Sequence, residues 1–288
     1  MTELALILVL VSAVAHAGWN FIAKQASAGP VFNWLFDLMS VGVCLPLAIA
    51  LVVTQQPHLS NLAWVFVVVS ALLELAYFVL LGQGYRAGDL SLVYPLARGT
   101  GPMLATAAAV VIFGERPSPL ALCGVILVGV GVFMLAGSPR ELRAPHARRA
   151  VGFALLTGMV IATYTLWDKQ AVSPEGGAIP PLMYFLLFTA CRALMLTPYA
   201  LTRMPTVRSE WQLHRKHALG VAVLSSLSYI LVLYALTISP VSYVAPVREI
   251  GILIGAVMGW RLLAEGSGGR RVAGALAMVA GVLALAFG

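Results

Sequence analysis

Residues 90–115 read LSLVYPLARGTGPMLATAAAVVIFGE, an apolar stretch that contains one arginine and two prolines. The stretch is long enough to cross a bilayer as a helix, since ~20 residues at ~1.5 Å rise span a ~30 Å hydrocarbon core. An arginine inside such a span is costly, so Arg98 indicates a buried partner or an aqueous substrate path. Prolines loosen a helix, which is tolerated only where protein or water satisfies the freed backbone groups.

The same pattern occurs a second time, at residues 242–266, SYVAPVREIGILIGAVMGWRLLAEG. Pro95 matches Pro246 at an offset of 151 residues, which places Arg98 opposite Glu249, one position after Arg248. Two spans that each carry charge just past a proline suggest a site shared between the two halves of a transporter.

Composition identifies the chain as a multi-pass membrane protein. Of its 288 residues, 60% are hydrophobic and only 10% are charged, whereas soluble proteins carry roughly 25% charged residues. The net charge of +7 comes mainly from connectors, where basic residues set topology. Basic and aromatic residues do not interleave outside the spans, so nucleic acid is not an expected partner. The three cysteines lie in apolar segments without metal-ligand spacing and are expected to be core residues.

Ten apolar segments, separated by short polar connectors, predict an all-α integral membrane protein with ten transmembrane helices. The longest connectors are expected at Ser138–Arg149 and Thr202–His217. The first segment contains small-residue sites typical of signal-peptide cleavage, but it lacks a basic start, so we expect a retained helix. The segments cover residues 4–23, 31–53, 62–82, 90–113, 118–137, 149–168, 180–201, 217–237, 241–262 and 271–287.

The chain is predicted to be an internal duplication. The motif Trp19-Asn20…Lys24 matches Tyr164-Thr165…Lys169 at an offset of 145 residues, and the glycines of the fifth and tenth segments match at an offset of 150. These matches place one five-helix repeat at 1–138 and a second at 149–288, joined by a basic loop at 139–148. Because five is odd, the two repeats must cross the membrane in opposite senses, a common secondary-transporter plan.

Loop charges predict the orientation. Connectors after odd-numbered segments hold thirteen Lys and Arg residues, and those after even-numbered segments hold two, Arg116 and Lys169. The positive-inside rule then places the odd connectors in the cytoplasm and both termini outside the cytoplasmic membrane.

Two arginines are the strongest candidates for substrate contact. Arg98 and Arg248 each lie several residues inside a span, too deep for easy snorkelling, and Tyr94 shares a helical face with Arg98. Glu249 and Glu74 are the carboxylates available to neutralise them. Because burial disfavours the charged form of a carboxyl group, Glu74 and Glu249 are also candidate proton carriers.

Several other polar or aromatic residues are candidates for a cavity or for the core. His16, Trp19 and Asn20 share one face of the first segment, which either bonds across helices or lines a cavity. Tyr77 lies on the face of Glu74, and Tyr229 occupies a similar place in the eighth segment. Asp37 and Arg192, in equivalent segments of the two repeats, are interpreted as a structural pair. A lone histidine is a poor metal ligand, and neither a metal nor a cofactor is predicted.

Glycines at helical spacing predict close helix packing. Gly251, Gly255 and Gly259 form GxxxGxxxG, and Gly124/Gly131 and Gly274/Gly281 form matched pairs. Such glycines pack helices either within one chain or in a homodimer. The sequence contains no catalytic motif, so an enzyme is not expected.

The chain resembles the EamA-type transporters of the drug/metabolite transporter superfamily. The resemblance rests on HAGWN with a following lysine, on YPLARGTGP running to Gly-Glu, on the glycine-rich fifth and tenth segments and on the five-plus-five organisation. HAGWN and the arginine of the fourth segment look closest to members associated with phosphonate utilisation. The family is usually drawn with both termini in the cytoplasm, the reverse of the orientation that the loop charges predict.

The resemblance implies a central cavity lined by the first, third and fourth helices of each half. The residues carried into it are Trp19, Asn20, Glu74, Tyr77, Tyr94 and Arg98 from one half and Tyr164, Tyr229, Arg248 and Glu249 from the other. The predicted function is a secondary transporter that moves a small polar metabolite, anionic or zwitterionic, such as an amino acid, phosphonate or organic acid, by alternating access. The alternatives are a lipid-linked substrate flippase, a multidrug exporter, or a membrane protein without transport activity. Its expected partners are a small-molecule substrate and membrane lipid.

Overall fold

The computed structural model describes residues 1–26, 29–57, 59–88, 90–135, 147–254 and 269–288. Every regular element in these ranges is a helix. The first repeat contains α1 (Glu3–Lys24), α2 (Pro30–Gln55), α3 (Asn61–Ala87), α4 (Leu90–Ile112) and α5 (Pro119–Leu135). The second contains α7 (Arg148–Val172), α8 (Pro181–Leu201), α9 (Met204–Ile238), α10 (Val241–Arg248) and α12 (Gly269–Phe287). These helices follow the ten predicted segments and confirm the all-α membrane fold.

Length and surface composition fit a membrane environment. Within the described ranges, six helices are long and apolar enough to cross a membrane, namely α1, α2, α3, α7, α8 and α9, and α5 and α12 contain shorter apolar stretches. Large apolar side chains point outward: Val111 is 83% exposed, Val53 70% and Leu194 72%. Such side chains are stable facing lipid and costly facing water.

The predicted connector Thr202–His217 is wrong for most of its length, because α9 already begins at Met204. The misprediction followed from its charge, but the segment is a polar helix with one inward face. Val207 is buried against Val31, Leu35 and Ala200, while the charged side chains on the other faces are mostly exposed. A polar stretch of this kind is helical through packing along one stripe.

The helix break predicted near the prolines occurs in only one of the two equivalent spans. α4 continues through Pro95 and Pro102 without interruption. α10 ends at Arg248, Glu249 takes a turn conformation, and the helix resumes at Ile250. At the interruption, the Glu249 N–H donates to the Pro246 carbonyl at 3.1 Å and the Glu249 carbonyl accepts from Ile252 at 2.9 Å, so the segment itself satisfies these backbone groups.

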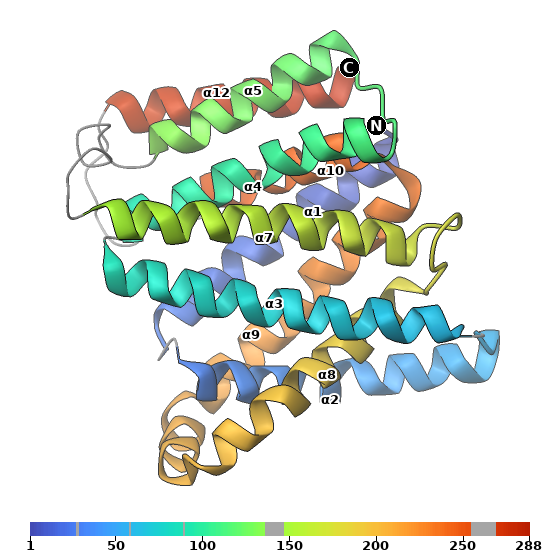
Figure 1. Ribbon diagram of the computed structural model, residues 1–288, viewed down its shortest axis with the longest axis vertical. Coiled ribbons are helices and arrows are strands. Elements are labelled where there is room, and N and C mark those ends of the chain that lie inside the picture. Colours follow the sequence, from blue (N-terminus) through green and yellow to red (C-terminus); the bar gives the residue numbers. More distant parts are fainter. Residues whose placement is uncertain (27–28, 58, 89, 136–146, 255–268) are drawn as a thin grey trace.

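The helices stack along the long axis of the molecule, from α5 and α12 at one end to α2 and α8 at the other (Figure 1). The contacts between the two repeats obey a two-fold rule. Equivalent helices of the two repeats pack on each other: α5 on α12, and α2 on α8. Non-equivalent helices pack in matched pairs. The contact of α1 with α9 matches that of α7 with α3, and the contact of α1 with α10 matches that of α7 with α4. Both termini lie on one side, as ten crossings require (Figure 1).

The matched glycines pack inside the chain, between α5 and α12. A Cβ atom on Gly124 would lie 2.7 Å from the Gly281 carbonyl oxygen, and one on Gly281 would lie 2.7 Å from that of Gly124. The two backbones therefore touch, which only glycine permits. Gly251 lies against Ala13 of α1; Gly255 and Gly259 fall outside the described residues, and a homodimer stays a prediction.

Two charged side chains hold the junction between α9 and α10. Lys169 Nζ donates hydrogen bonds to the carbonyl oxygens of Leu236, at 2.6 Å, and Ser239, at 3.1 Å. Glu115 accepts from the backbone N–H groups of Val241, at 2.7 Å, and Ser242, at 2.9 Å. A cation at the end of α9 and an anion at the start of α10 both complement the helix dipoles.

Candidate functional site

A polar cavity of about 60 Å³ lies between the two repeats. Its walls come from α1, α2, α3 and α4 of one repeat and from α7, α8, α9 and α10 of the other. The lining includes His16, Trp19, Ser40, Glu74, Tyr77, Arg98, Tyr164, Arg192, Tyr229 and Arg248, together with Phe36, Phe78, Phe185 and Phe188. The cavity has room for a few water molecules in this state of the protein.

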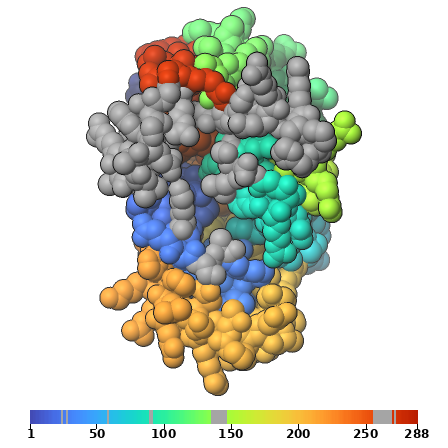
Figure 2. Space-filling view, turned by 90° about the vertical axis from the view of Figure 1, so that its left-hand side faces the viewer, coloured from blue at the N-terminus to red at the C-terminus, as the bar shows by residue number. Residues whose placement is uncertain are grey.

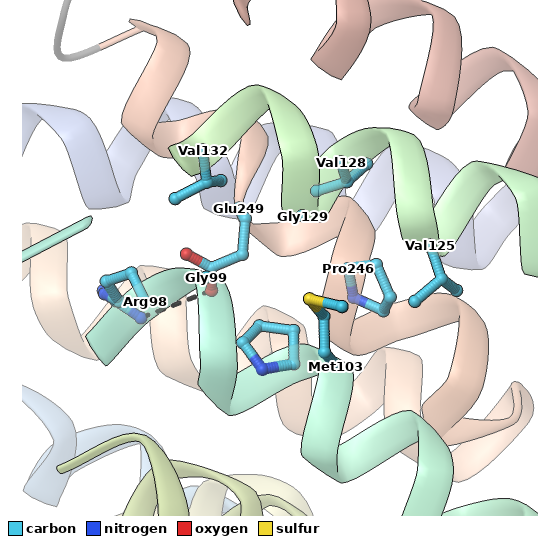
Figure 3. Close-up of a pocket in the computed structure, with 10 residues that line it drawn as sticks. Arg98, Gly99, Met103, Val125, Val128, Gly129, Val132, Pro246 and Glu249 are labelled. Carbon is cyan, nitrogen blue, oxygen red and sulfur yellow. Dashed lines mark hydrogen bonds and ion pairs between the residues drawn. The ribbon is translucent and has the colours of Figure 1, made fainter. Parts of the chain in front are cut away.

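Arg98 and Glu249 form an ion pair where the two proline-containing spans cross. The Arg98 guanidinium approaches Glu249 Oε1 at 3.5 Å, and both side chains are buried. Figure 3 shows the two side chains reaching toward each other from α4 and from the end of α10. Arg98 also contacts His16 Nε2 and lies over the Tyr94 ring, 5.8 Å from its centroid. Glu249 and Glu74 were both expected as partners for either arginine, and the structure pairs Glu249 with Arg98.

Arg192 of α8 joins two carboxylates. It binds Asp37 of α2 through two hydrogen bonds, 2.9 Å from Nε and 2.5 Å from a terminal nitrogen. Its other terminal nitrogen donates to Glu74 Oε2 of α3 at 3.1 Å. Two-point binding fixes the plane of the guanidinium, so Asp37 positions Arg192 at the cavity wall. Arg192 therefore does more than the structural pairing that the sequence suggested, because it also lines the cavity.

Tyr229 of α9 links Glu74 to a third carboxyl group, Asp168 of α7. Its hydroxyl oxygen lies 3.0 Å from Glu74 Oε1 and 2.5 Å from Asp168 Oδ2. The other oxygen of Asp168 accepts hydrogen bonds from Ser70, at 2.7 Å, and Tyr184, at 2.8 Å. Asp168 is 2% exposed. Within the described part of the chain, hydroxyl groups are its only hydrogen-bonding partners, and no cation lies within ion-pair distance.

Arg248 is the cavity arginine without a carboxylate partner. Its guanidinium lies over the ring of Tyr229, 5.4 Å from the centroid, and its buried Nε has no hydrogen-bond partner. Across the described ranges, no carboxylate lies within ion-pair distance of it. A buried cation that lacks an anionic partner is costly, so the site is ready to accept an anion.

The structure brings eight of the eleven predicted site residues to the cavity wall, and three lie behind it. Those at the wall are His16, Trp19, Glu74, Tyr77, Arg98, Tyr164, Tyr229 and Arg248. Asn20 donates to the carbonyl of His16 at 2.7 Å, Tyr94 supports Arg98, and Glu249 holds Arg98 from a crevice next to the cavity. Their contact with a substrate stays a prediction.

Sequence analysis missed Asp168 and the phenylalanines of the wall. Asp168 was placed at the very end of the predicted segment 149–168, where a charge is ordinary, whereas α7 continues to Val172. Its spacing from Tyr164, four residues on the same helical face, was the available signal. Within the described residues, no group of three or more His, Cys, Asp or Glu side chains has metal-site geometry.

The fold and the buried cavity define a multi-pass helical membrane protein built from two repeats around a polar centre. Residues 3–137 and 148–287 each match the model of the EamA-like transporter family. The chain therefore belongs to the EamA-like transporter family, and this membership indicates a membrane transporter.

Similar proteins support the repeat organisation. An uncharacterized protein of Methanocaldococcus jannaschii is 28% identical over 139 residues, which are 46% of this chain and 97% of that protein. The relative is thus about as long as one half of this chain. The spermidine export protein MdtI of Salmonella arizonae is 41% identical over 61 residues, 21% of this chain and 56% of its own length. The chain therefore spans just over half of MdtI.

A solved structure described as "Crystal structure of protein" superimposes with a TM-score of 0.74. It is 14% identical, and the match covers 97% of this chain and 98% of that one. At this identity the likeness shows a shared fold.

Proposed function

We propose that the protein is a secondary transporter for a small anionic or zwitterionic metabolite, which binds in the cavity between the repeats. The observation that carries the proposal is Arg248, a buried guanidinium at the cavity wall with no carboxylate within ion-pair distance in the described ranges. The other two cavity arginines are already paired, Arg98 with Glu249 and Arg192 with Asp37 and Glu74. A carboxylate, phosphonate or phosphate group of the substrate would supply the missing partner.

The cavity wall also suits the rest of such a molecule. Tyr77 and Tyr164 meet edge to face at 6.2 Å between ring centroids, and Phe185 and Phe188 flank Tyr229. These rings offer apolar surface to a short carbon chain. Glu74 lies on the same wall and already binds Arg192 and Tyr229; its negative charge beside Arg248's side of the cavity would favour the zwitterion of an amino acid, whose carboxylate Arg248 binds, over a free cation.

Transport would proceed by alternating movement of the two repeats around this site. The cavity of about 60 Å³ is small for a metabolite, so the repeats must separate on one side to admit it. The pseudo-two-fold contacts allow the same separation on the other side, because most inter-repeat contacts have an equivalent.

A polyamine is the second candidate substrate. The relative MdtI is named a spermidine exporter, and four buried carboxyl groups outnumber three arginines around the cavity. Against this, Glu249, Asp37 and Glu74 are bound to arginines. The fourth carboxyl group, Asp168, lies behind the cavity wall, whereas Arg248, which has no carboxylate within ion-pair distance in the described ranges, lines the cavity. We therefore favour an anionic group.

The test is thermal stability of the purified protein against a panel of amino acids, phosphonates, monovalent carboxylates and sulfonates, sugars and spermidine. A ligand that binds only the folded state stabilises it by ~2.7 kcal/mol at a hundred times its dissociation constant. We expect an anionic or zwitterionic compound to raise the thermal midpoint of the wild type. In Arg248→Ala, most or all of that rise should be lost.

Arg98→Ala is the matched comparison, because it leaves Glu249 buried without its partner and should lower the basal stability itself. Arg248→Ala strands no carboxylate and should keep its basal stability. If spermidine alone stabilises the protein, or if a hit is unaffected by Arg248→Ala, the anion site is refuted.

A further inference from the structure

We infer that Asp168, Tyr229 and Glu74 form a proton-binding site that favours binding of the anionic substrate when it is occupied. The inference rests on the proposed function for the identity of the coupled ligand, but the proton site itself is testable without any ligand. Glu74 and Glu249 were the proton carriers expected from the sequence; the proposed site keeps Glu74 and adds Asp168, which Tyr229 joins to it.

The Tyr229 hydroxyl group has too few hydrogens for its two carboxyl neighbours. The Tyr229 hydroxyl oxygen contacts a carboxyl oxygen on each side, Glu74 Oε1 at 3.0 Å and Asp168 Oδ2 at 2.5 Å. A phenol carries one hydrogen, so it can donate to only one of the two. If both carboxyl groups were ionised, the other contact would join two oxygen atoms with no hydrogen between them. One extra proton makes both contacts hydrogen bonds.

The net charge around the cavity also favours one bound proton. Eight buried His, Arg, Asp and Glu side chains surround the cavity in the described ranges: His16, Arg98, Arg192 and Arg248, and Asp37, Glu74, Asp168 and Glu249. His16 is counted as neutral, because the Arg98 guanidinium contacts its Nε2 atom and disfavours a second positive charge there. With every carboxyl group ionised, their sum is −1. Taking a lone ionised carboxylate out of water is costly, and such groups tend to bind a proton instead. One proton brings the sum to zero.

Asp168 is the buried carboxyl group whose negative charge no cation in the described ranges balances. The groups that contact it are Ser70 from α3, Tyr184 from α8 and Tyr229 from α9, and Tyr229 joins it to Glu74 of α3. None of these is a cation, and Arg192, which binds Glu74, is already held by Asp37 and Glu74. The proton is therefore assigned to Asp168 Oδ2, which donates to the Tyr229 oxygen, while the Tyr229 hydroxyl donates to Glu74.

The hydrogen bonds from Glu74 through Tyr229 to Asp168 also give the proton a route between Asp168 and the cavity. Glu74 and Tyr229 line the cavity, whereas Asp168 lies behind them. A proton that binds Glu74 Oε1 from cavity water can pass to the Tyr229 oxygen as the Tyr229 hydrogen passes to Asp168. Each step breaks one O–H bond and forms another, and the reverse sequence returns the proton to water.

The sign of the coupling follows from Arg248, which lies against the face of the Tyr229 ring. An occupied proton site makes the surroundings of Arg248 less negative by one unit, so an anion there binds more tightly. Linkage then requires the anion to tighten proton binding by the same factor. Proton and anion bind together and leave together, which is the thermodynamic basis of symport.

The proton site is tested by infrared difference spectroscopy of the purified protein without ligand, taken between acidic and alkaline pH. We expect the band of a protonated, buried carboxyl group that disappears at alkaline pH. The band should be lost in Asp168→Asn and should persist in Glu249→Gln. A band that vanishes with Glu249→Gln, or that persists in Asp168→Asn, overturns the assignment.

Tyr229→Phe keeps the experiment decisive if Asp168→Asn does not fold. It removes the acceptor of the Asp168 proton while preserving the ring, so the band should shift in frequency. Tyr164→Phe is the matched control, since this phenol lines the same cavity but forms no hydrogen bond to Asp168, Tyr229 or Glu74. Equal shifts in both variants, or no shift in Tyr229→Phe, contradict the bridge.

The coupling is tested by repeating the ligand panel with monovalent carboxylates and sulfonates, whose own charge is constant across the range. Stabilisation should be larger at acidic than at alkaline pH in the wild type and independent of pH in Asp168→Asn. Equal stabilisation at both pH values in the wild type refutes the coupling. If no compound binds at any pH, the proposed function fails, and the infrared band alone decides the proton site.

Discussion

The charged side chains around the cavity differ in how completely each is neutralised. Arg192 has two carboxylate partners, Arg98 has one, and Arg248 has none in the described part of the chain. An arginine whose guanidinium is paired with carboxylates holds the helices that carry them together. An arginine without a carboxylate partner can bind an anionic ligand. We therefore assign Arg192 mainly to positioning Glu74 and Arg248 to anchoring the substrate.

The Arg192–Asp37 pair should contribute strongly to stability. Arg192→Met would leave Asp37, which is fully buried, without its cation, and breaking a buried pair typically costs ~3–5 kcal/mol. We expect a large fall in the thermal midpoint of the detergent-solubilised protein. The double variant Arg192→Met/Asp37→Asn removes both charges and should recover part of the loss. An unchanged midpoint in Arg192→Met contradicts the prediction.

Sequence reasoning found some of these charged residues and missed another for a definable reason. The duplication aligns Arg98 with Glu249 in sequence, but it left open which arginine Glu249 neutralises; only the packing of α4 against the end of α10 pairs it with Arg98. Asp168 was missed because its environment is made by Ser70, Tyr184 and Tyr229, hydroxyl groups from three other helices. A hydroxyl carries no charge pattern along a sequence, so its convergence on a carboxyl group is visible only after packing.

At the level of helices, the closest contact between the repeats is the packing of α5 on α12. Gly124→Ala would place a Cβ atom 2.7 Å from the Gly281 carbonyl oxygen and 2.9 Å from Leu285. Backbone cannot move aside as a side chain can, so the helices must separate. Overpacking of this kind costs ~1–3 kcal/mol, and we expect a lower thermal midpoint.

Gly42→Ala in α2 is the control, because nothing lies within 4 Å of the added Cβ atom. Alanine in a helix interior is more favourable than glycine by ~0.5–1 kcal/mol, so this variant should be neutral or more stable. If Gly124→Ala is as stable as Gly42→Ala, the two helices are not in backbone contact. Size-exclusion chromatography of both variants would also measure their oligomeric state. Because Gly124 packs against Gly281 of the same chain, the predicted homodimer should be unchanged in Gly124→Ala.

Helix positions were predictable from apolar periodicity, whereas two features of the helices were not. The start of α9 at Met204 was hidden because its polar residues resemble a loop until the buried stripe at Val207 is known. The turn at Glu249 appears in one span, although both carry the same proline. Local sequence therefore permits the interruption, and the packing around each span decides whether it forms.

Considered as a whole, the molecule has a strongly basic side. Arg86, Arg148, Arg149, Arg203, Arg208, Arg215, Lys216 and Arg270 are exposed at helix ends on the side opposite the termini. Figure 2 faces this side, with the turn between α8 and α9 and the first turns of α9 at its lower end. On the side of the termini, Arg116 is exposed, and Lys169 is bound to backbone carbonyls.

This asymmetry predicts that the basic side faces the cytoplasm and that both termini lie outside. We expect an alkaline phosphatase fused to the C-terminus to be active in intact cells and a fluorescent protein fused there to remain dark. Exchanging Arg203, Arg208, Arg215 and Lys216 for glutamine removes four charges from the start of α9, where the side chains are exposed, and should yield a mixed population. A bright fluorescent fusion in the unaltered chain would contradict the prediction and give the orientation in which the family is usually drawn. The four-residue variant would then show whether the start of α9 still contributes to orientation.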